Sequence, residues 1–154
     1  MAVMLACPAW MSAQHNITDG AWNITFDESA KTLTYEQNGK QLIKGAYVEV
    51  HNAAEEKLLS KDYPSVSLTS EAVSDVFGSG TKYTYTYSGL AGKDNIEQSI
   101  YIYPGKNYLL VEAAIVATGG TTKTNYIAPM VSTTSTTFLP SGGENVVYDM
   151  PHDN

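Results

Sequence analysis

The chain contains no arginine, and all nine basic residues among its 154 residues are lysines. Sixteen acidic residues bring the formal net charge to −7. Proteins that bind nucleic acid depend on clustered arginine and lysine to contact phosphates and base edges. This composition argues against nucleic acid and against an anionic membrane surface as partners, and an acidic surface mainly keeps a protein in solution.

Cysteine is nearly absent, since Cys7 is the only one and no internal disulfide is possible. Long apolar runs are also missing, so we expect no membrane span. Residues 1–13 are uncharged, apolar and end in small residues, which resembles the back half of a signal peptide cleaved after Ala13. Lipidation of Cys7 and an ordinary buried segment remain alternatives. The interpretation is an exported protein, periplasmic or extracellular, in which a signal peptide remnant precedes one domain over residues 14–154.

Motifs for nucleotide, metal or nucleophilic chemistry are missing as well. Gly78-Ser79-Gly80 lacks the helix and the Lys-Ser/Thr pair of a phosphate loop, and it is predicted to be a turn. His15, His51 and His152 lie far apart without the spacing of metal ligands. No serine occupies a nucleophile elbow. The sequence therefore predicts neither a cofactor nor a metal ion.

Residues that favour a pleated surface are abundant, including 11 tyrosines and many threonines and valines. From residue 14 onward apolar and polar residues alternate with period two between closely spaced turns, which is typical of an antiparallel sandwich or barrel. The prediction is an all-β protein, an antiparallel β-sandwich of about ten strands. The last element, beginning at Val146, is expected to be incomplete. Strands are expected at residues 21–26, 32–36, 41–51, 65–70, 72–77, 81–87, 96–103, 108–117 and 125–133.

Turns and strand environments can also be predicted. Asn38-Gly39 between two alternating runs indicates a type I′ hairpin, and residues 104–107 have Pro and Gly where a turn requires them. Residues 51–62 are expected to form a loop with at most one helical turn. The nearly continuous apolar run 108–117 predicts a central strand covered on both faces.

Aromatic residues and carboxylates are the candidates for binding. Trp22 and the stripe of Tyr83, Tyr85 and Tyr87 could form an exposed platform for a sugar ring, although a stripe at strand spacing more often belongs to the core. Glu55-Glu56 is expected in a solvated loop. Glu112, inside the apolar run, is either a hydrogen-bonded edge residue or a functional carboxylate with a raised pKa.

The densest polar cluster lies in the C-terminal tail. Asp149, His152, Asp153 and Asn154 surround Pro151, which stiffens the segment. Carboxylate and amide groups pair well with vicinal hydroxyls, so these four residues are the predicted substrate-binding residues. A plain polar loop is the alternative.

Several stretches together resemble the N-terminal domain of bacterial glycoside hydrolases similar to α-galactosidases, the melibiase-like clan, especially of the Bacteroidetes type. The resemblance runs from about Ala21 to the end of the chain and lies in the order and spacing of its motifs. It implies a supersandwich of the galactose-mutarotase kind, followed in the parent chain by a (β/α)₈ barrel with two catalytic carboxylates. His152 stands where the family's tail usually has Phe. The motifs are residues 72–83, 102–109, 125–129, 138–140 and 149–154.

Two functions of different classes follow from these observations. The first is an accessory domain of a secreted α-galactosidase-like hydrolase, which would support the catalytic barrel of the same parent chain and contribute a loop to binding of an α-galactoside-type glycan. No pair of carboxylates about 5 Å apart, as retaining hydrolysis requires, can be nominated here, so no catalytic residue is predicted. The alternative is a stand-alone carbohydrate-binding or surface-adhesion module. A mutarotase-like isomerase is disfavoured, because such an enzyme needs a longer chain.

Overall fold

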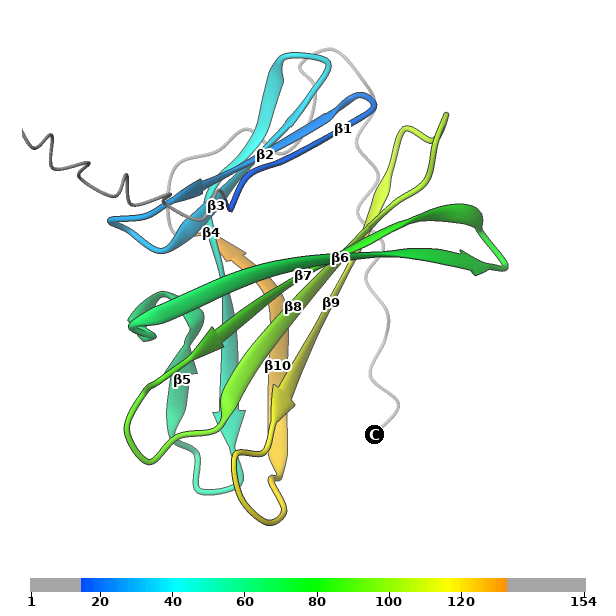
Figure 1. The fold of residues 1–154 in the computed structure, drawn as a ribbon. Coiled ribbons are helices and arrows are strands. Elements are labelled where there is room, and N and C mark those ends of the chain that lie inside the picture. The colour runs from blue at the N-terminus through cyan, green and yellow to red at the C-terminus, as the bar shows by residue number, and fades with distance from the viewer. Residues whose placement is uncertain (1–14, 133–154) are drawn as a thin grey trace, which may run out of the picture.

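The computed structural model describes residues 15–132, and these residues form two antiparallel sheets, with one short 3₁₀ turn and no α-helix (Figure 1). The predicted all-β sandwich of about ten strands is confirmed. The elements are β1 (Ile17–Asp19), β2 (Trp22–Asp27), β3 (Thr32–Gln37), β4 (Lys40–Asn52), β5 (Lys57–Leu59), η1 (Ser60–Asp62), β6 (Ser65–Asp75), β7 (Gly78–Ser88), β8 (Asn95–Ile102), β9 (Leu109–Val116) and β10 (Thr124–Ser132).

The two sheets have different strand orders. The larger one runs β1-β2-β3-β4-β10, with β5 also pairing with β4, and the smaller one runs β6-β7-β8-β9. Most strands that follow one another in sequence therefore pair as hairpins. There are two exceptions: the chain crosses from the larger to the smaller sheet between β5 and β6, and β10 returns to lie beside β4, which brings the larger sheet next to β9.

The core lies between the two sheets and follows the period of two. On β2, Trp22, Ile24 and Phe26 are buried, while the residues between them are more exposed. The tyrosine stripe of β7 faces the same core, where Tyr85 and Tyr87 are fully buried. The stripe is therefore core packing and not an exposed sugar platform.

The β3–β4 turn has the predicted form. Asn38 and Gly39 have φ angles of 51° and 73°, the two left-handed conformations that a type I′ turn requires. The Asn38 backbone N–H also donates to the Ala21 carbonyl oxygen at 2.8 Å, which joins this turn to the neighbouring β1–β2 turn.

The prediction of a turn at residues 78–80 was wrong. The turn lies at Val76-Phe77, and Gly78 already begins β7, while the two short strands expected at 65–70 and 72–77 form the single strand β6. Gly80 lies within β7, and glycine is required there because a Cβ would stand 2.5 Å from the Ile102 carbonyl oxygen. This glycine permits close packing and does not mark a turn.

The prediction of a central strand at residues 108–117 was also wrong. β9 pairs only with β8 and ends its sheet, and most of its side chains are partly exposed. Its continuous apolar pattern arises because some side chains, such as Ile115, pack on the core while β10 lies alongside. The strands β1 and β5 were not predicted, since three residues are too few to establish a period. Residues 51–62, expected to form a loop with at most one helical turn, contain the single 3₁₀ turn η1 and also the short strand β5.

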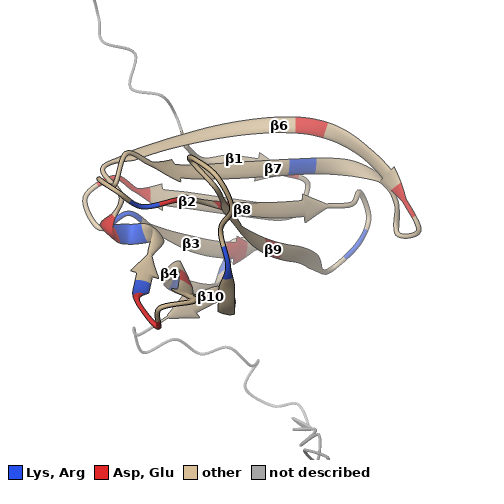
Figure 2. Cartoon of the chain, turned by 90° about the horizontal axis from the view of Figure 1, so that it is seen from below, with Lys and Arg blue, Asp and Glu red and all other residues tan. Residues whose placement is uncertain are grey.

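Charged residues are interspersed over strands and turns in the described part of the chain (Figure 2). Several oppositely charged pairs are formed, such as Lys82 with Glu71 at 3.2 Å. Within residues 15–132, no helix has the length and hydropathy needed to cross a lipid bilayer.

Candidate functional site

A cleft lies where three turns meet at one end of the sandwich. These are the β1–β2 turn, the β3–β4 turn and the β8–β9 turn, which gather at the upper right of Figure 1. The cleft has a volume of about 290 Å³, which is close to the lower limit for sites that hold small molecules. Its walls come from both sheets, so only the folded sandwich creates it.

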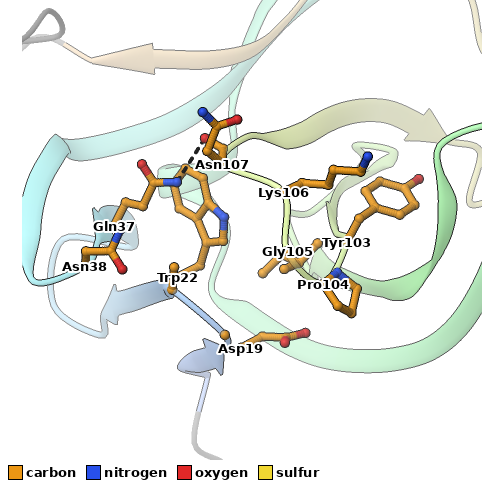
Figure 3. A pocket seen from close by; sticks show the side chains of 12 residues that line it. Asp19, Trp22, Gln37, Asn38, Tyr103, Pro104, Gly105, Lys106 and Asn107 are labelled. Atoms are coloured by element: carbon orange, nitrogen blue, oxygen red, sulfur yellow. Dashed lines mark hydrogen bonds between the residues drawn. The ribbon is translucent and has the colours of Figure 1, made fainter.

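The floor of the cleft is apolar and buried. Trp22, at the start of β2, is only 6% exposed, and Ile102 and Tyr103, at the end of β8, are each 2% exposed. The Trp22 indole Nε1 is shielded from solvent and has no hydrogen-bond partner among the described residues. Figure 3 shows this nitrogen on the side of the ring that faces the turn at Gly105 and Lys106.

The rim of the cleft is polar and exposed, with Asn38 on one side and Lys106 and Asn107 on the other. The two sides are tied together, because the Gln37 Nε2 donates to the Asn107 carbonyl oxygen at 2.9 Å (Figure 3). This hydrogen bond joins residues 70 positions apart and fixes the β8–β9 turn against the larger sheet.

The β8–β9 turn is stiff because of its sequence. Pro104 and Gly105 occupy its two central positions, Gly105 has a φ of 74°, and the Lys106 N–H donates to the Tyr103 carbonyl oxygen at 3.1 Å. These features define a type II turn, in which Pro and Gly suit the two central conformations. The turn predicted at residues 104–107 is confirmed, and its local sequence positions the cleft residues Lys106 and Asn107.

Two tyrosine hydroxyls at the cleft donate hydrogen bonds to carboxylates. The Tyr83 hydroxyl donates to one Asp19 carboxylate oxygen at 3.0 Å, and the Tyr103 hydroxyl donates to an Asp75 oxygen at 2.6 Å. Burial and the Asp19 hydrogen bond raise the pKa of Tyr83, and the hydrogen bond to Asp75, with burial, raises the pKa of Tyr103 to about 12. Both hydroxyls therefore keep their protons at neutral pH and continue to donate. Among the described residues the second Asp19 oxygen has no hydrogen-bond partner.

The cleft combines apolar walls with a few polar groups that have no partner among the described residues. The Trp22 indole N–H is unpartnered among these residues but shielded at the floor, Lys106 brings an ammonium group to the rim, and one Asp19 oxygen is left as an acceptor. No three His, Cys, Asp or Glu side chains within residues 15–132 gather so that they could hold a metal ion.

The Glu49 carboxylate of β4, the one buried acidic group among the described residues, already has partners. Glu49 accepts from Lys57 at 2.8 Å and His51 at 2.9 Å, so both its oxygens are engaged. The Lys57 hydrogen bond, with a smaller contribution from His51, lowers the pKa of Glu49 against the opposing effect of burial. A second hollow of about 340 Å³ near Asn52, Asp94 and Lys123 is more open. The end cleft is the more enclosed of the two hollows.

Asp149, His152, Asp153 and Asn154, the predicted substrate-binding residues, lie outside the described residues, as does Cys7. Their proposed contact with a glycan stays a prediction.

The other residues that the sequence suggested for binding lie within the described part of the chain. Trp22, considered as an exposed platform, is buried and lines the floor of the cleft. Glu112 is exposed and accepts from the Tyr101 hydroxyl at 2.7 Å, which is the hydrogen-bonded alternative. Glu55 and Glu56 lie in an exposed loop as predicted, where Glu55 accepts from Asn125 and Glu56 from Lys93.

Sequence reasoning missed the polar residues of the cleft. Asp19-Gly20 is itself a hairpin dipeptide and could have indicated the β1–β2 turn. Two of the three turns were predicted, but local signals do not reveal that three turns meet at one end of the sandwich.

Comparison with known proteins adds no relative. No model of a protein family, no curated protein and no solved structure matches this chain. The likeness to galactose-mutarotase supersandwiches and to α-galactosidase-like hydrolases therefore stays a prediction from the sequence motifs.

Proposed function

We propose that this domain is a non-catalytic, carbohydrate-recognising β-sandwich, serving as the N-terminal accessory domain of an exported glycoside hydrolase that resembles α-galactosidases. In this role it supports a catalytic barrel and holds part of a glycan, while hydrolysis occurs elsewhere in the parent enzyme.

The observation that carries the proposal is the end cleft. Its floor presents an aromatic ring and aliphatic surface, and its rim presents amide, ammonium and carboxylate groups. Sites for small polar ligands combine these two kinds of surface, since apolar walls supply contact area and a few polar groups fix orientation. A sugar ring has apolar C–H groups on its faces and hydroxyl groups around its circumference. It can therefore contact the apolar floor and form hydrogen bonds with the polar rim.

The proposal assigns no hydrolysis to this domain. Retaining glycosidases need two carboxyl groups about 5 Å apart, one acting as acid and the other as nucleophile. Asp19 is the only carboxylate among the described residues that line the cleft, so no second carboxylate there could complete such a pair. The tail residues around Pro151 would add a further contact with the glycan.

Affinity electrophoresis of the full 154-residue chain tests this function. The chain should be retarded in a gel that contains galactomannan with α-galactosyl branches, compared with the same gel without polysaccharide. It should release no nitrophenol from nitrophenyl α-galactoside. Unchanged mobility across a panel of α- and β-linked polysaccharides would contradict carbohydrate recognition. Hydrolysis that co-purifies with the chain would contradict the non-catalytic role.

A further inference from the structure

We infer that the end cleft binds a single neutral pyranose unit, and that the Trp22 indole N–H donates a hydrogen bond to one of its oxygens. This inference rests on the proposed carbohydrate function and identifies the site, the size and the charge of the ligand.

The first step concerns the unpartnered indole. Buried polar groups nearly always have a hydrogen-bond partner, and an exception requires an explanation. Trp22 is 6% exposed, and its Nε1 has no partner among the described residues. An indole can only donate, so the missing partner must supply an acceptor such as a hydroxyl or ring oxygen. His15 Nε2 is also buried without a partner, but His15 does not line the cleft.

The second step concerns the balance of donors and acceptors. Lys106 and the Asn38 amide can donate from the rim, and the second Asp19 oxygen can accept. A sugar hydroxyl both donates and accepts, so it can satisfy neighbouring groups of either kind. A ligand carrying only acceptors would leave the second Asp19 oxygen without a partner.

The third step concerns charge. Asp19 and Lys106 carry the only acidic and basic side chains among the lining residues, so their formal charges cancel. The chain as a whole carries a formal charge of −7, which repels anions at longer range. Both observations favour a neutral sugar over a uronic acid or a sugar phosphate.

The fourth step concerns size and access. A volume of about 290 Å³ suits one ring and not a chain of several. The indole nitrogen faces Gly105 and Lys106, whose side of the cleft is exposed (Figure 3). Binding through this nitrogen therefore requires the β8–β9 turn to move outward when the ligand enters, so that a ligand oxygen reaches the nitrogen.

Nuclear magnetic resonance of the indole N–H groups tests the inference on the full chain. The chain has two tryptophans, and a Trp10→Phe variant leaves Trp22 as the only indole signal. Methyl α-galactopyranoside should shift this signal along a saturable curve with a Kd of about 1 mM, an ordinary affinity for a ligand of this size. Galacturonate, which is similar in shape but anionic, should bind at least about tenfold more weakly.

Variants separate the site from the function. Trp22→Phe keeps an aromatic ring but removes the N–H, and it should weaken binding of methyl α-galactopyranoside about tenfold, as should Asp19→Asn. Lys106→Gln should also weaken binding. Lys123→Gln, which makes the same change in the second hollow, should leave binding unchanged. The remaining amide signals report whether each variant is folded.

The possible outcomes test the site, the charge of the ligand and the carbohydrate function separately. Binding at full affinity by a folded Trp22→Phe variant, with the Trp22 signal unmoved by sugar in the Trp10→Phe chain, would overturn the cleft as the site and leave the carbohydrate function standing. Equal or tighter binding of galacturonate would overturn the neutral ligand. No shift of any signal with methyl α-galactopyranoside, together with no retardation by any polysaccharide, would overturn both the site and the function.

Discussion

Gly80 lies in β7 beneath the end of β8, where there is no room for a side chain. A Cβ at this position would stand 2.5 Å from the Ile102 carbonyl oxygen and 2.8 Å from Tyr103 Cδ1. Since backbone cannot yield as a flexible side chain does, Gly80→Ala should lower the free energy of unfolding by about 1–3 kcal/mol. Urea denaturation measures this. Gly119→Ala is the matched control, because nothing lies within 4 Å of its Cβ position, and equal effects of both changes would contradict the steric argument.

Gln98 is a fully buried amide that links the two sheets. Its Nε2 donates to the Pro129 carbonyl oxygen of β10 at 2.8 Å, and its Oε1 accepts from the Tyr87 hydroxyl at 3.5 Å. Gln98→Leu keeps the volume but leaves these groups unpaired, so thermal or urea unfolding should show a loss of about 1–3 kcal/mol. Gln41→Leu, at an exposed position of β4, should change stability by less than about 0.5 kcal/mol. An unchanged free energy of unfolding for Gln98→Leu would mean that water takes the place of the amide as a hydrogen-bond partner.

At the scale of elements, a β-bulge in β4 lies between the part of this strand that pairs mainly with β3 and the part that pairs with β5 and β10. Leu33 pairs with Ala46 and Tyr35 with Ile43, so Lys44 and Gly45 together lie opposite one residue of β3. Gly45 has a φ of 69°, the left-handed conformation that such bulges assign to glycine. Beyond the bulge β4 pairs with β5 and β10.

Substitution of Gly45 tests the bulge. Gly45→Ala should destabilise the fold by about 1–2 kcal/mol, because alanine is strained at this φ. Gly45→Asn should recover part of that loss, since asparagine tolerates the left-handed region better. Urea denaturation of both variants compares them directly. Alanine and asparagine variants of equal stability would show that the conformation of residue 45 does not decide the register.

The sequence was informative where structure is local. The alternation in β2, β3 and β7 and the Asn38-Gly39 turn follow from neighbouring residues, and these predictions are confirmed. The turn predicted at Gly80 was wrong because glycine is required there by a contact with the end of β8, which lies far away in sequence. The prediction that β9 is a central strand was wrong because an apolar run does not reveal whether its strand lies at the edge of a sheet. The cleft could not be predicted for the same reason, since it exists only where turns from both sheets meet.

At the scale of the whole molecule, the core is built around tyrosines that must stay protonated. Burial raises the pKa of Tyr35, Tyr85 and Tyr87, and it raises that of Tyr63 to about 12, with the charge of Asp94 adding to the effect. In the unfolded chain these hydroxyls ionise near pH 10. Between about pH 10 and 12 the unfolded state therefore binds fewer protons than the folded state.

The sign of the pH dependence follows from that difference. Stability from these groups is fully present below pH 10 and declines as the pH rises, by up to about 1.4 kcal/mol per pH unit for each tyrosine that only the unfolded state ionises. Urea denaturation at stepped pH values from 8 to about 11 should show a plateau followed by a steep fall. Tyr63→Phe removes one such group together with its hydrogen bond to the Asp94 carbonyl oxygen at 2.6 Å. This variant should be less stable at neutral pH but lose stability less steeply above pH 10. Identical slopes in the two proteins would mean that Tyr63 ionises freely in the folded state.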